Sequence, residues 1–281
     1  MIREIDSKKI AEAVSKLAVE ACTELPEDVL RALKAALKKE SSSSGKEVLK
    51  QLLENARIAR EEKLPICQDT GFAVVFVDLG ADVSVRGATV EEAVNEGVRR
   101  GYSEGFLRKS IVASPFRREN TKDNTPADVI IDIVPGSEIR ITFMAKGGGS
   151  ENVSALRMFN PSADFSEISA FVVDEIANAG PNPCPPVIIG LGIGGTADKA
   201  MLLAKKALLR EVGRASADKE TAKKEKELLA AVNKTGVGPS GLGGNTTALA
   251  VHIETFPCHI ASLPVALAVD CHAHRIKRAI I

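Results

Sequence analysis

The stretch from Pro65 to Gly71, with the sequence Pro-Ile-Cys-Gln-Asp-Thr-Gly, constrains the fold more than any other part of the chain. Helices usually end before a proline, and the apolar run Phe72–Val77 that follows the stretch predicts a strand. Cys67 therefore lies in a loop between a helix and a strand, where a rigid scaffold often carries functional residues. A lone cysteine can equally be a small buried hydrophobic residue, so its role depends on the rest of the chain.

The composition is ordinary for a globular protein and argues against several functional classes. The 281 residues are 44% hydrophobic and 26% charged, and Lys+Arg and Asp+Glu both total 37. Zero net charge argues against nucleic-acid or membrane-surface binding by bulk charge. No apolar run reaches the roughly 18 residues of a membrane span, and the charged N-terminus does not resemble a signal peptide. We therefore expect a cytoplasmic protein with no nucleic-acid or membrane partner.

The first part of the chain, residues 1–62, is expected to be helical. Asp6 can cap a first helix, and Pro26 suits the first turn of a second helix. The serine run at 41–44, closed by Gly45, predicts a polar loop before a third helix that ends ahead of Pro65.

The rest of the chain alternates strand-like and helical patterns. A helix over 90–100 should stop at Gly101, and the runs 129–134 and 138–143, separated by Pro-Gly, predict a hairpin. We interpret the whole, residues 1–281, as one α/β (α+β) domain, in which the helical part precedes a mixed β-sheet flanked by helices. The further helices are predicted over 165–178, 197–209 and 219–233, and the further strands over 187–191, 246–253 and 264–269.

Three cysteines share a setting at predicted strand ends: Cys67, Cys184 between prolines, and Cys271 directly after a strand. Strand ends of one sheet converge, so these thiols can meet. No Cys-x-x-Cys motif is present, which argues against a zinc ribbon. Three thiolates could hold zinc with an open fourth position or three corners of a [4Fe–4S] cluster, or they could be unrelated structural cysteines. Cys258, also in a loop, competes with Cys271 as the third ligand.

Three glycine-rich segments, at 147–149, 192–195 and 241–244, form a second group of candidates. Their backbone N–H groups could form an anion-binding nest, or the missing side chains could let the backbone approach a cofactor. They match neither the dinucleotide nor the phosphate-loop signature. Ordinary turns at strand ends are the alternative.

Three polar residues form a third group. A buried arginine is a bidentate carboxylate clamp, which is the role that we consider for Arg108. His259, next to a proline and a cysteine, could donate to a substrate, and Asp69 could orient a base or a water molecule. Each of these residues could instead be solvated or structural.

Together these motifs resemble the iron–sulfur (class I) fumarate hydratase family, in particular the α subunit of its two-chain form. They follow the order of that family over nearly the whole chain. The matching segments are Pro65–Gly71, Leu107, Arg108 and Ser110, Ala145–Asn152, Cys184–Pro186, Gly192–Gly195, Gly243 and Gly244 before Thr246 and Thr247, Pro257 and His259 ahead of Ala261–Pro264, and Cys271.

The resemblance implies that Cys67, Cys184 and Cys271 bind a [4Fe–4S] cluster and leave one iron open as a Lewis acid. It favours Cys271 over Cys258, since the family commonly has another residue at the latter position. The implied substrate-binding residues are Gln68, Arg108, Gly147, Gly148 and His259, and the implied catalytic residues are Asp69, which would support proton transfer, and His259.

The implied reaction is the reversible hydration of fumarate to (S)-malate. Single-chain relatives continue into a further domain, whereas this sequence ends at Ile281. The resemblance therefore implies a β subunit that carries the C-terminal domain and the catalytic base, in an αβ or α2β2 assembly acting on a C4-dicarboxylate. The alternatives are an L-tartrate dehydratase α subunit that forms oxaloacetate, an enzyme for a mesaconate-type substrate, and a non-catalytic iron–sulfur or zinc redox sensor.

Overall fold

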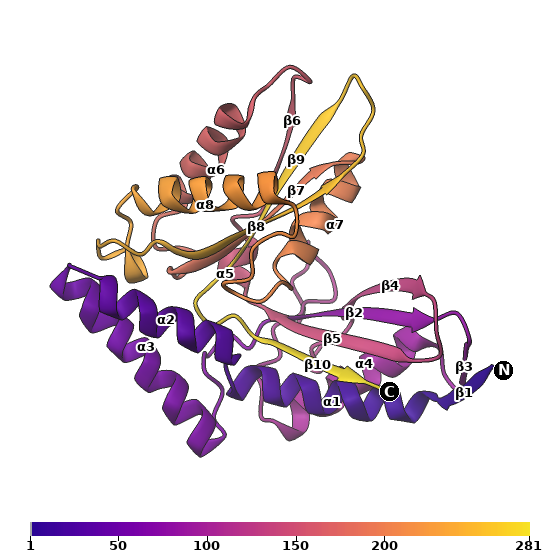
Figure 1. Cartoon of the computed structure of the whole chain (residues 1–281). Helices are drawn as coiled ribbons and strands as arrows, with labels where there is room; N and C mark the ends of the chain where they lie inside the picture. The colour runs from indigo at the N-terminus through magenta and orange to yellow at the C-terminus, as the bar shows by residue number, and fades with distance from the viewer. Residues whose placement is uncertain (1) are drawn as a thin grey trace. The chain divides into compact units, whose positions relative to one another are not determined.

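The computed structural model describes residues 2–281, which form two compact units (Figure 1). Unit 1 comprises residues 2–26, 56–148 and 275–281, and unit 2 comprises residues 27–55 and 149–274. Each unit contains its own four-stranded mixed sheet with helices packed on it. The predicted α/β class is therefore confirmed, while the assignment of residues 1–281 to one domain stays a prediction.

The sheet of unit 1 has the strand order β10-β5-β2-β4. The central strand β2 is antiparallel to β5 and parallel to β4, and β5 is antiparallel to β10. A separate parallel pair is formed by β1 and β3. The strands are β1 (Arg3–Asp6), β2 (Phe72–Gly80), β3 (Val83–Arg86), β4 (Asp128–Val134), β5 (Ile139–Lys146) and β10 (Ile276–Ile280).

The predicted hairpin of two adjacent strands is wrong, because β2 lies between β4 and β5. The chain does bend at residues 135–137, where the Gly136 carbonyl accepts from the Asp82 amide at 3.0 Å. However, β2 is buried along most of its length and takes a central position, whereas β4 is only partly buried and takes the edge. Burial therefore overrode the local turn signal in choosing the strand neighbours.

Helices α1 (Ser7–Thr23) and α4 (Val90–Glu104) pack together on this sheet. Asp6 caps α1 as predicted, and Thr89 with Glu92 forms a capping box for α4. The predicted helix stop at Gly101 is wrong, because Gly101 lies within α4. A Cβ atom at this position would lie 2.7 Å from the Ser15 carbonyl oxygen, so glycine permits the close approach of the two helices.

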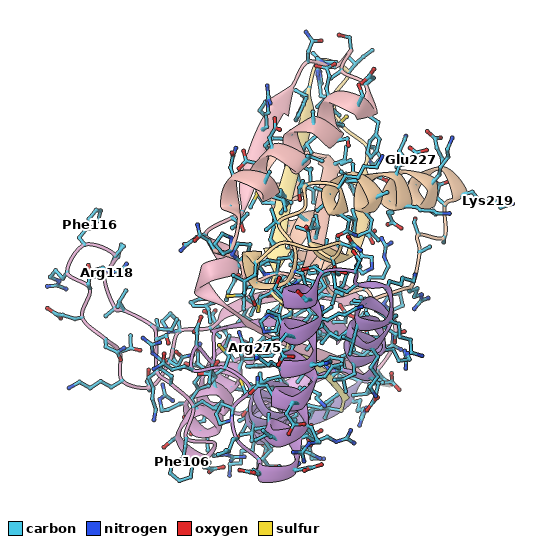
Figure 2. All side chains as sticks on the ribbon, turned by 90° about the vertical axis from the view of Figure 1, so that its left-hand side faces the viewer. Phe106, Phe116, Arg118, Lys219, Glu227 and Arg275 are labelled. Carbon is cyan, nitrogen blue, oxygen red and sulfur yellow. The ribbon has the colours of Figure 1, made fainter. Side chains whose placement is uncertain are left out.

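The segment between α4 and β4, residues 105–127, projects from unit 1, with Phe116 and Arg118 at its outer end (Figure 2). One isolated antiparallel bridge, between Val112 and Asn120, joins its two sides. Asn124, fully buried at its base, accepts from the Ser110 amide at 2.7 Å. The projection is therefore an ordered loop.

Two further helices, α2 (Glu27–Lys39) and α3 (Ser43–Glu62), follow α1, and α3 runs from unit 2 into unit 1. The predicted polar loop at 41–44 is shorter than expected, because α3 begins within the serine run. The Ser42 hydroxyl accepts from the Gly45 amide at 3.2 Å, so this serine caps the helix and Gly45 continues it.

The sheet of unit 2 has the strand order β6-β9-β7-β8. Strand β7 is parallel to β8 and antiparallel to β9, which in turn is antiparallel to β6. Helices α6 and α8 lie against this sheet (Figure 1), and their apolar residues share one core with one of its faces. The elements are α5 (Gly148–Glu151, at the unit boundary), β6 (Ala155–Phe159), α6 (Phe165–Ala179), β7 (Val187–Gly194), α7 (Ala197–Ala207), α8 (Lys219–Asn233), the 3-10 turn η1 (Pro239–Gly241), β8 (Ala248–Phe256) and β9 (Leu263–Asp270).

The opposite face of this sheet is covered by α7, and two glycines of β7 make the contact possible. Cβ atoms at Gly190 and Gly192 would overlap the carbonyl oxygens of Ala204 and Ala200 in α7. Gly192 thus serves helix packing, which gives the segment 192–195 a structural purpose.

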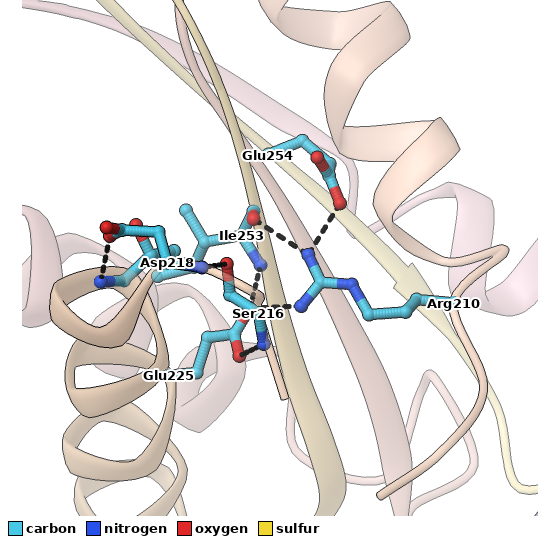
Figure 3. Close-up of polar contacts among 7 residues, drawn as sticks. Arg210, Ser216, Asp218, Glu225, Ile253 and Glu254 are labelled. Atoms are coloured by element: carbon cyan, nitrogen blue, oxygen red, sulfur yellow. Dashed lines mark hydrogen bonds and ion pairs between the residues drawn. The ribbon is translucent and has the colours of Figure 1, made fainter. Parts of the chain in front are cut away.

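An ion-pair network in unit 2 links the segment after α7 to α8 and β8 (Figure 3). Arg210 pairs with Glu225 and Glu254, each at 2.5 Å, and donates to the Ile253 carbonyl at 2.9 Å. Glu225 is buried but accepts from the Ser216 amide at 2.9 Å. These bonds satisfy the buried carboxylate. Within residues 2–281, no helix has the length and apolar character needed to cross a membrane.

Candidate functional site

Residues 65–71 of unit 1, here called the Cys67 loop, are fixed from beneath by buried groups. The Ile66 amide donates to the Cys22 carbonyl at 2.9 Å. The hydroxyl of Tyr102 lies 2.8 Å from the Thr70 carbonyl oxygen and 3.1 Å from that of Gly71. Cys67 itself is exposed and forms no disulfide. The loop thus presents its thiol to the surface from a rigid base.

Asp69 joins the Cys67 loop to the glycine segment that follows β5. One of its carboxylate oxygens accepts from the Gly71 amide at 3.0 Å, and the other accepts from the Gly148 amide at 2.9 Å. The buried Arg275 also donates to the Asp69 carbonyl. Three predicted site residues, Asp69, Gly147 and Gly148, are thereby brought together. Arg275 was not recognised from the sequence.

The thiol of Cys22 and the hydroxyl of Tyr102 are neutral groups beneath this loop. Burial raises the pKa of Cys22 to about 11 and raises the pKa of Tyr102 well above its usual value. Cys22 lies in the core as expected for a small apolar residue. Its burial distinguishes it from the exposed Cys67, which is accessible to a ligand.

Gln68 and Arg108 are both exposed in unit 1. The expectation of a buried arginine is therefore wrong for Arg108, since its segment leaves the core directly after the buried Leu107. The Thr70 hydroxyl donates to the Arg108 carbonyl at 3.0 Å, which attaches this segment to the Cys67 loop. Both side chains are accessible to an anionic ligand.

Cys184 and Cys271 lie at the same end of the unit 2 sheet. Cys184 precedes β7 and Cys271 follows β9, and the register pairs Ile188 of β7 with Asp270 of β9. The His272 amide donates to the Cys184 carbonyl at 3.4 Å, and His272 Nδ1 lies 2.9 Å from the same oxygen. Cys184 is exposed and Cys271 half-buried, so the structure brings two of the three predicted ligands close together.

A buried polar network that the sequence analysis missed supports Cys271. Asp270 and His274 flank it, with 2.6 Å between the carboxylate and Nδ1 of the imidazole. His274 Nε2 lies 3.0 Å from the Leu208 carbonyl oxygen, and the Ser150 hydroxyl donates to Asp270 at 3.3 Å. The sequence Asp-Cys-His-Ala-His could have indicated this network, because polar groups near a cysteine at a buried strand end need hydrogen-bond partners.

His259 and Cys258 lie at the opposite end of the unit 2 sheet, in residues 257–262, here called the tip loop, which joins β8 to β9. They line an open hollow of about 680 Å³ with Lys199, Phe256 and other residues. Unit 2 therefore does not bring His259 together with Cys184 and Cys271. The same geometry separates Cys258 from these two cysteines.

The glycine segments are divided between the two ends of the unit 2 sheet. Gly194 and Gly195 lie at the tip-loop end, where a Cβ atom at Gly194 would lie 2.0 Å from the Phe256 carbonyl oxygen. The segment 241–244 lies at the cysteine end, since the Ser240 amide donates to the Pro185 carbonyl at 2.8 Å. A Cβ atom at Gly244 would lie 2.9 Å from a carboxylate oxygen of Glu40.

The donor chemistry at these positions is suited to a soft metal or a cluster, because the thiols are free of disulfides and two of them are exposed. Cys67 belongs to unit 1, and Cys184 and Cys271 belong to unit 2. Across residues 2–281 there is no group of three or more His, Cys, Asp or Glu side chains arranged to hold a metal ion.

Comparison with known proteins adds independent information. Residues 11–280 match the family described as "Fumarate hydratase (Fumerase)". The chain is 48% identical over 278 residues to the "Putative L(+)-tartrate dehydratase subunit alpha" of Methanocaldococcus jannaschii, covering 96% of this chain and 97% of that protein. It is 32% identical over 271 residues to the "L(+)-tartrate dehydratase subunit alpha" of Escherichia coli strain UTI89, covering 95% of this chain and 89% of that protein.

Proposed function

Because the chain belongs to the fumarate hydratase (Fumerase) family, a family of hydro-lyases, we propose that it is the α subunit of a [4Fe–4S]-dependent enzyme that reversibly hydrates fumarate to (S)-malate. The observation that carries this proposal is the family match over residues 11–280, which contain all three candidate cysteines. The cytoplasm is the proposed location.

We assign Cys67, Cys184 and Cys271 as the ligands of the cluster. The assignment of Cys184 and Cys271 is supported by their position at one end of the unit 2 sheet. The assignment of Cys67 is supported by its exposure on the anchored Cys67 loop. When bound, such a cluster supplies an open iron that polarises the C–O bond of the substrate as a Lewis acid. Three protein thiolates are the number that leaves this position open.

The residues around Cys67 are assigned to the substrate. The exposed guanidinium of Arg108 and the exposed amide of Gln68 can both bind a carboxylate. The Gly147 and Gly148 backbone is assigned to the same substrate. Asp69 is assigned to proton transfer, and its carboxylate also fixes the Gly148 amide.

The catalytic base is assigned to a β subunit. The relatives are named as alpha subunits, which implies a second chain in those proteins. We propose an αβ or α2β2 assembly in which the β subunit contacts the Cys67 loop. The α chain alone should then have little hydro-lyase activity.

A second candidate reaction is the dehydration of L(+)-tartrate to oxaloacetate. It is favoured by the names of the two relatives, which cover nearly the whole chain at 48% and 32% identity. Malate and tartrate are both 2-hydroxydicarboxylates, so the same carboxylate-binding groups would serve either substrate. The two reactions differ in the second hydroxyl group of tartrate.

The test is anaerobic co-expression with the β subunit, followed by parallel assays of malate and tartrate. Cys67→Ala should abolish the cluster absorbance and the activity together, because it removes one ligand. Cys258→Ala is the matched control, since this cysteine is equally free but lies away from Cys184 and Cys271 in unit 2, and it should retain both.

Three outcomes would count against the proposal. A cluster that survives Cys67→Ala would contradict the ligand assignment. Full activity of the α chain alone would contradict the role of the β subunit. An intact cluster whose spectrum does not respond to either dicarboxylate would favour a redox sensor instead.

A further inference from the structure

We propose that Arg275 is a positioning residue of the proposed cluster site. Its buried guanidinium holds the Cys67 loop from beneath and supplies a positive charge that raises the reduction potential of a cluster bound to Cys67. The inference rests on the proposed function, because it takes Cys67 to be a ligand of the cluster. It gives a role to a residue that lies outside both the ligands and the groups assigned to the substrate.

The guanidinium of Arg275 lies directly under the Cys67 loop. Arg275 is the largest fully buried side chain in residues 2–281 (Figure 2). It donates to the Asp69 carbonyl, which is a backbone group of the loop. Because two peptide units join Asp69 to Cys67, their Cα atoms are at most about 7.6 Å apart, at about 3.8 Å per unit. The charge of Arg275 is therefore close to the segment that carries the thiol.

Strand β5 fixes both Arg275 and the loop above it. The Ala145 amide donates to the Arg275 carbonyl at 3.0 Å, and the next residue, Ile276, pairs with Met144 of β5. Gly71, at the end of the loop, packs against the same part of β5, since a Cβ atom there would lie 2.9 Å from the carbonyl carbon of Ala145. The contact between the guanidinium and the loop is thus set by the sheet of unit 1.

The charge of Arg275 reaches the groups beneath the loop. Burial is the main cause of the raised pKa of Cys22 and of Tyr102, and the positive charge of Arg275 opposes both increases in pKa. The negative charge of Asp69 acts on the same two groups in the opposite direction. Salt screens buried charges only weakly, so we expect the guanidinium to act on a cluster held by Cys67 as well.

A positive charge at this position favours the reduced state of a bound cluster. Three thiolate ligands give the cluster negative charge, and reduction adds one electron to it. A nearby cation therefore stabilises the reduced state more than the oxidised state, which raises the reduction potential. Arginine suits this buried position because its guanidinium stays protonated.

The first test is an anaerobic redox titration of the reconstituted α chain with its β subunit, in which electron paramagnetic resonance detects the reduced cluster. Arg275→Met should shift the midpoint potential to a more negative value, because one buried positive charge is lost. Arg275→Lys keeps a positive charge at this position and should reverse most of that shift.

Arg278→Met is the matched control for the titration. Arg278 lies on the same strand, β10, but it is exposed, so water and salt screen its charge. The control removes the same charge and should leave the midpoint potential unchanged. Equal potentials in Arg275→Met and Arg278→Met would overturn the electrostatic role. A shift that Arg275→Lys does not reverse would also overturn it, because lost packing rather than lost charge would then be the cause.

The second test measures the positioning role and needs no cluster. The Asp69 carboxylate accepts from the Gly71 and Gly148 amides, so hydrogen exchange of these amides reports whether the loop is held. In the cluster-free protein, Arg275→Met should accelerate their exchange about tenfold or more, as expected for the loss of a hydrogen bond from a charged donor. Arg278→Met should not change it. Unchanged exchange in Arg275→Met would overturn the positioning role.

The wild-type assembly separates failure of this inference from failure of the proposed function. If the reconstituted wild type binds no cluster, the proposed function is wrong and the exchange measurement alone decides the positioning role. If the wild type binds the cluster but Arg275→Met changes neither the potential nor the exchange, only the role of Arg275 is wrong.

Discussion

At the scale of single residues, the position of Cys67 depends on Tyr102, which lies fully buried beneath the loop. Its hydroxyl is the donor closest to the Thr70 carbonyl oxygen and contacts that of Gly71. Tyr102→Phe should lower the free energy of unfolding by about 1–2 kcal/mol, because two buried carbonyl groups lose a donor. Urea denaturation measures this loss.

The control for Tyr102→Phe is Ser162→Ala, which removes an exposed hydroxyl bonded to its neighbour Asn160. We expect that variant to change stability by less than about 0.5 kcal/mol. Hydrogen exchange of the Ile66 amide should also rise in Tyr102→Phe. Equal stability of the two variants would show that Tyr102 does not hold the loop.

A second residue-scale prediction concerns His252, which is buried in β8 near the Arg210 network. Burial, reinforced by the positive charge of Arg210, lowers the pKa of His252 from 6.5 to about 4. The unfolded chain therefore binds a proton at this residue below about pH 6.5, while the folded chain stays neutral until about pH 4. This difference destabilises the fold progressively as the pH falls between these values, by up to ~3 kcal/mol.

Comparison with His252→Gln isolates this contribution. The variant lacks the titrating imidazole, so its stability should fall less between pH 7 and pH 4.5 than that of the wild type. Urea denaturation at the two pH values measures the difference. Identical pH dependence in both proteins would mean that His252 is protonated in the folded state.

At the scale of elements, the contact between β7 and α7 depends on glycine. A Cβ atom at Gly192 would overlap the Ala200 carbonyl, which belongs to the rigid backbone of α7. Gly192→Ala should destabilise unit 2 by about 3 kcal/mol, because either the strand or the helix must shift. Gly148→Ala is the control, since its Cβ would meet only an Asp69 oxygen at 3.8 Å. Thermal denaturation measures the effect. An equal decrease in the Tm of both variants would contradict this account.

Helices and strands with a strong local sequence signal could be predicted. Strands that form only by pairing with a distant segment of the chain could not. The helix over 219–233 has matching bounds in the structure because Asp218 caps it and its apolar residues recur at helical spacing. Strand β10 was missed because Ile276–Ile280 is short and carries Lys277 and Arg278. Only pairing with β5, far away in the sequence, makes this segment a strand.

The same distinction applies to the candidate site. The separation of His259 from Cys271 could be predicted, because the predicted strand 264–269 lies between them in the sequence. The place of Cys184 beside Cys271 could not, because Cys184 precedes β7 and Cys271 follows β9, and they share one sheet end only because these strands are antiparallel. Strand direction follows from the pairing of distant segments and has no local sequence signal.

At the scale of the whole molecule, the last residues complete the first unit to be synthesised. Residues 275–281 belong to unit 1, where β10 pairs with β5 and Arg275 donates to the Asp69 carbonyl. Unit 1 therefore cannot reach its final structure until residues 275–281 are made. The Cys67 loop and the C-terminal strand form one structural group although Asp69 and Arg275 are 206 positions apart in the sequence.

Removal of residues 275–281 should therefore damage unit 1 and spare unit 2. The truncated chain exposes the edge of β5 and loses the Arg275 contact, so the Tm of unit 1 should fall by about 10 °C or more. Hydrogen exchange should increase along β5 and the Cys67 loop, while β7 and β9 retain their protection. The single variant Arg275→Met keeps β10 and removes only the contact with Asp69. Its decrease in the Tm of unit 1 should therefore be smaller than that of the truncated chain. Loss of protection in β7 equal to that in β5 would show instead that the two units unfold as one cooperative body.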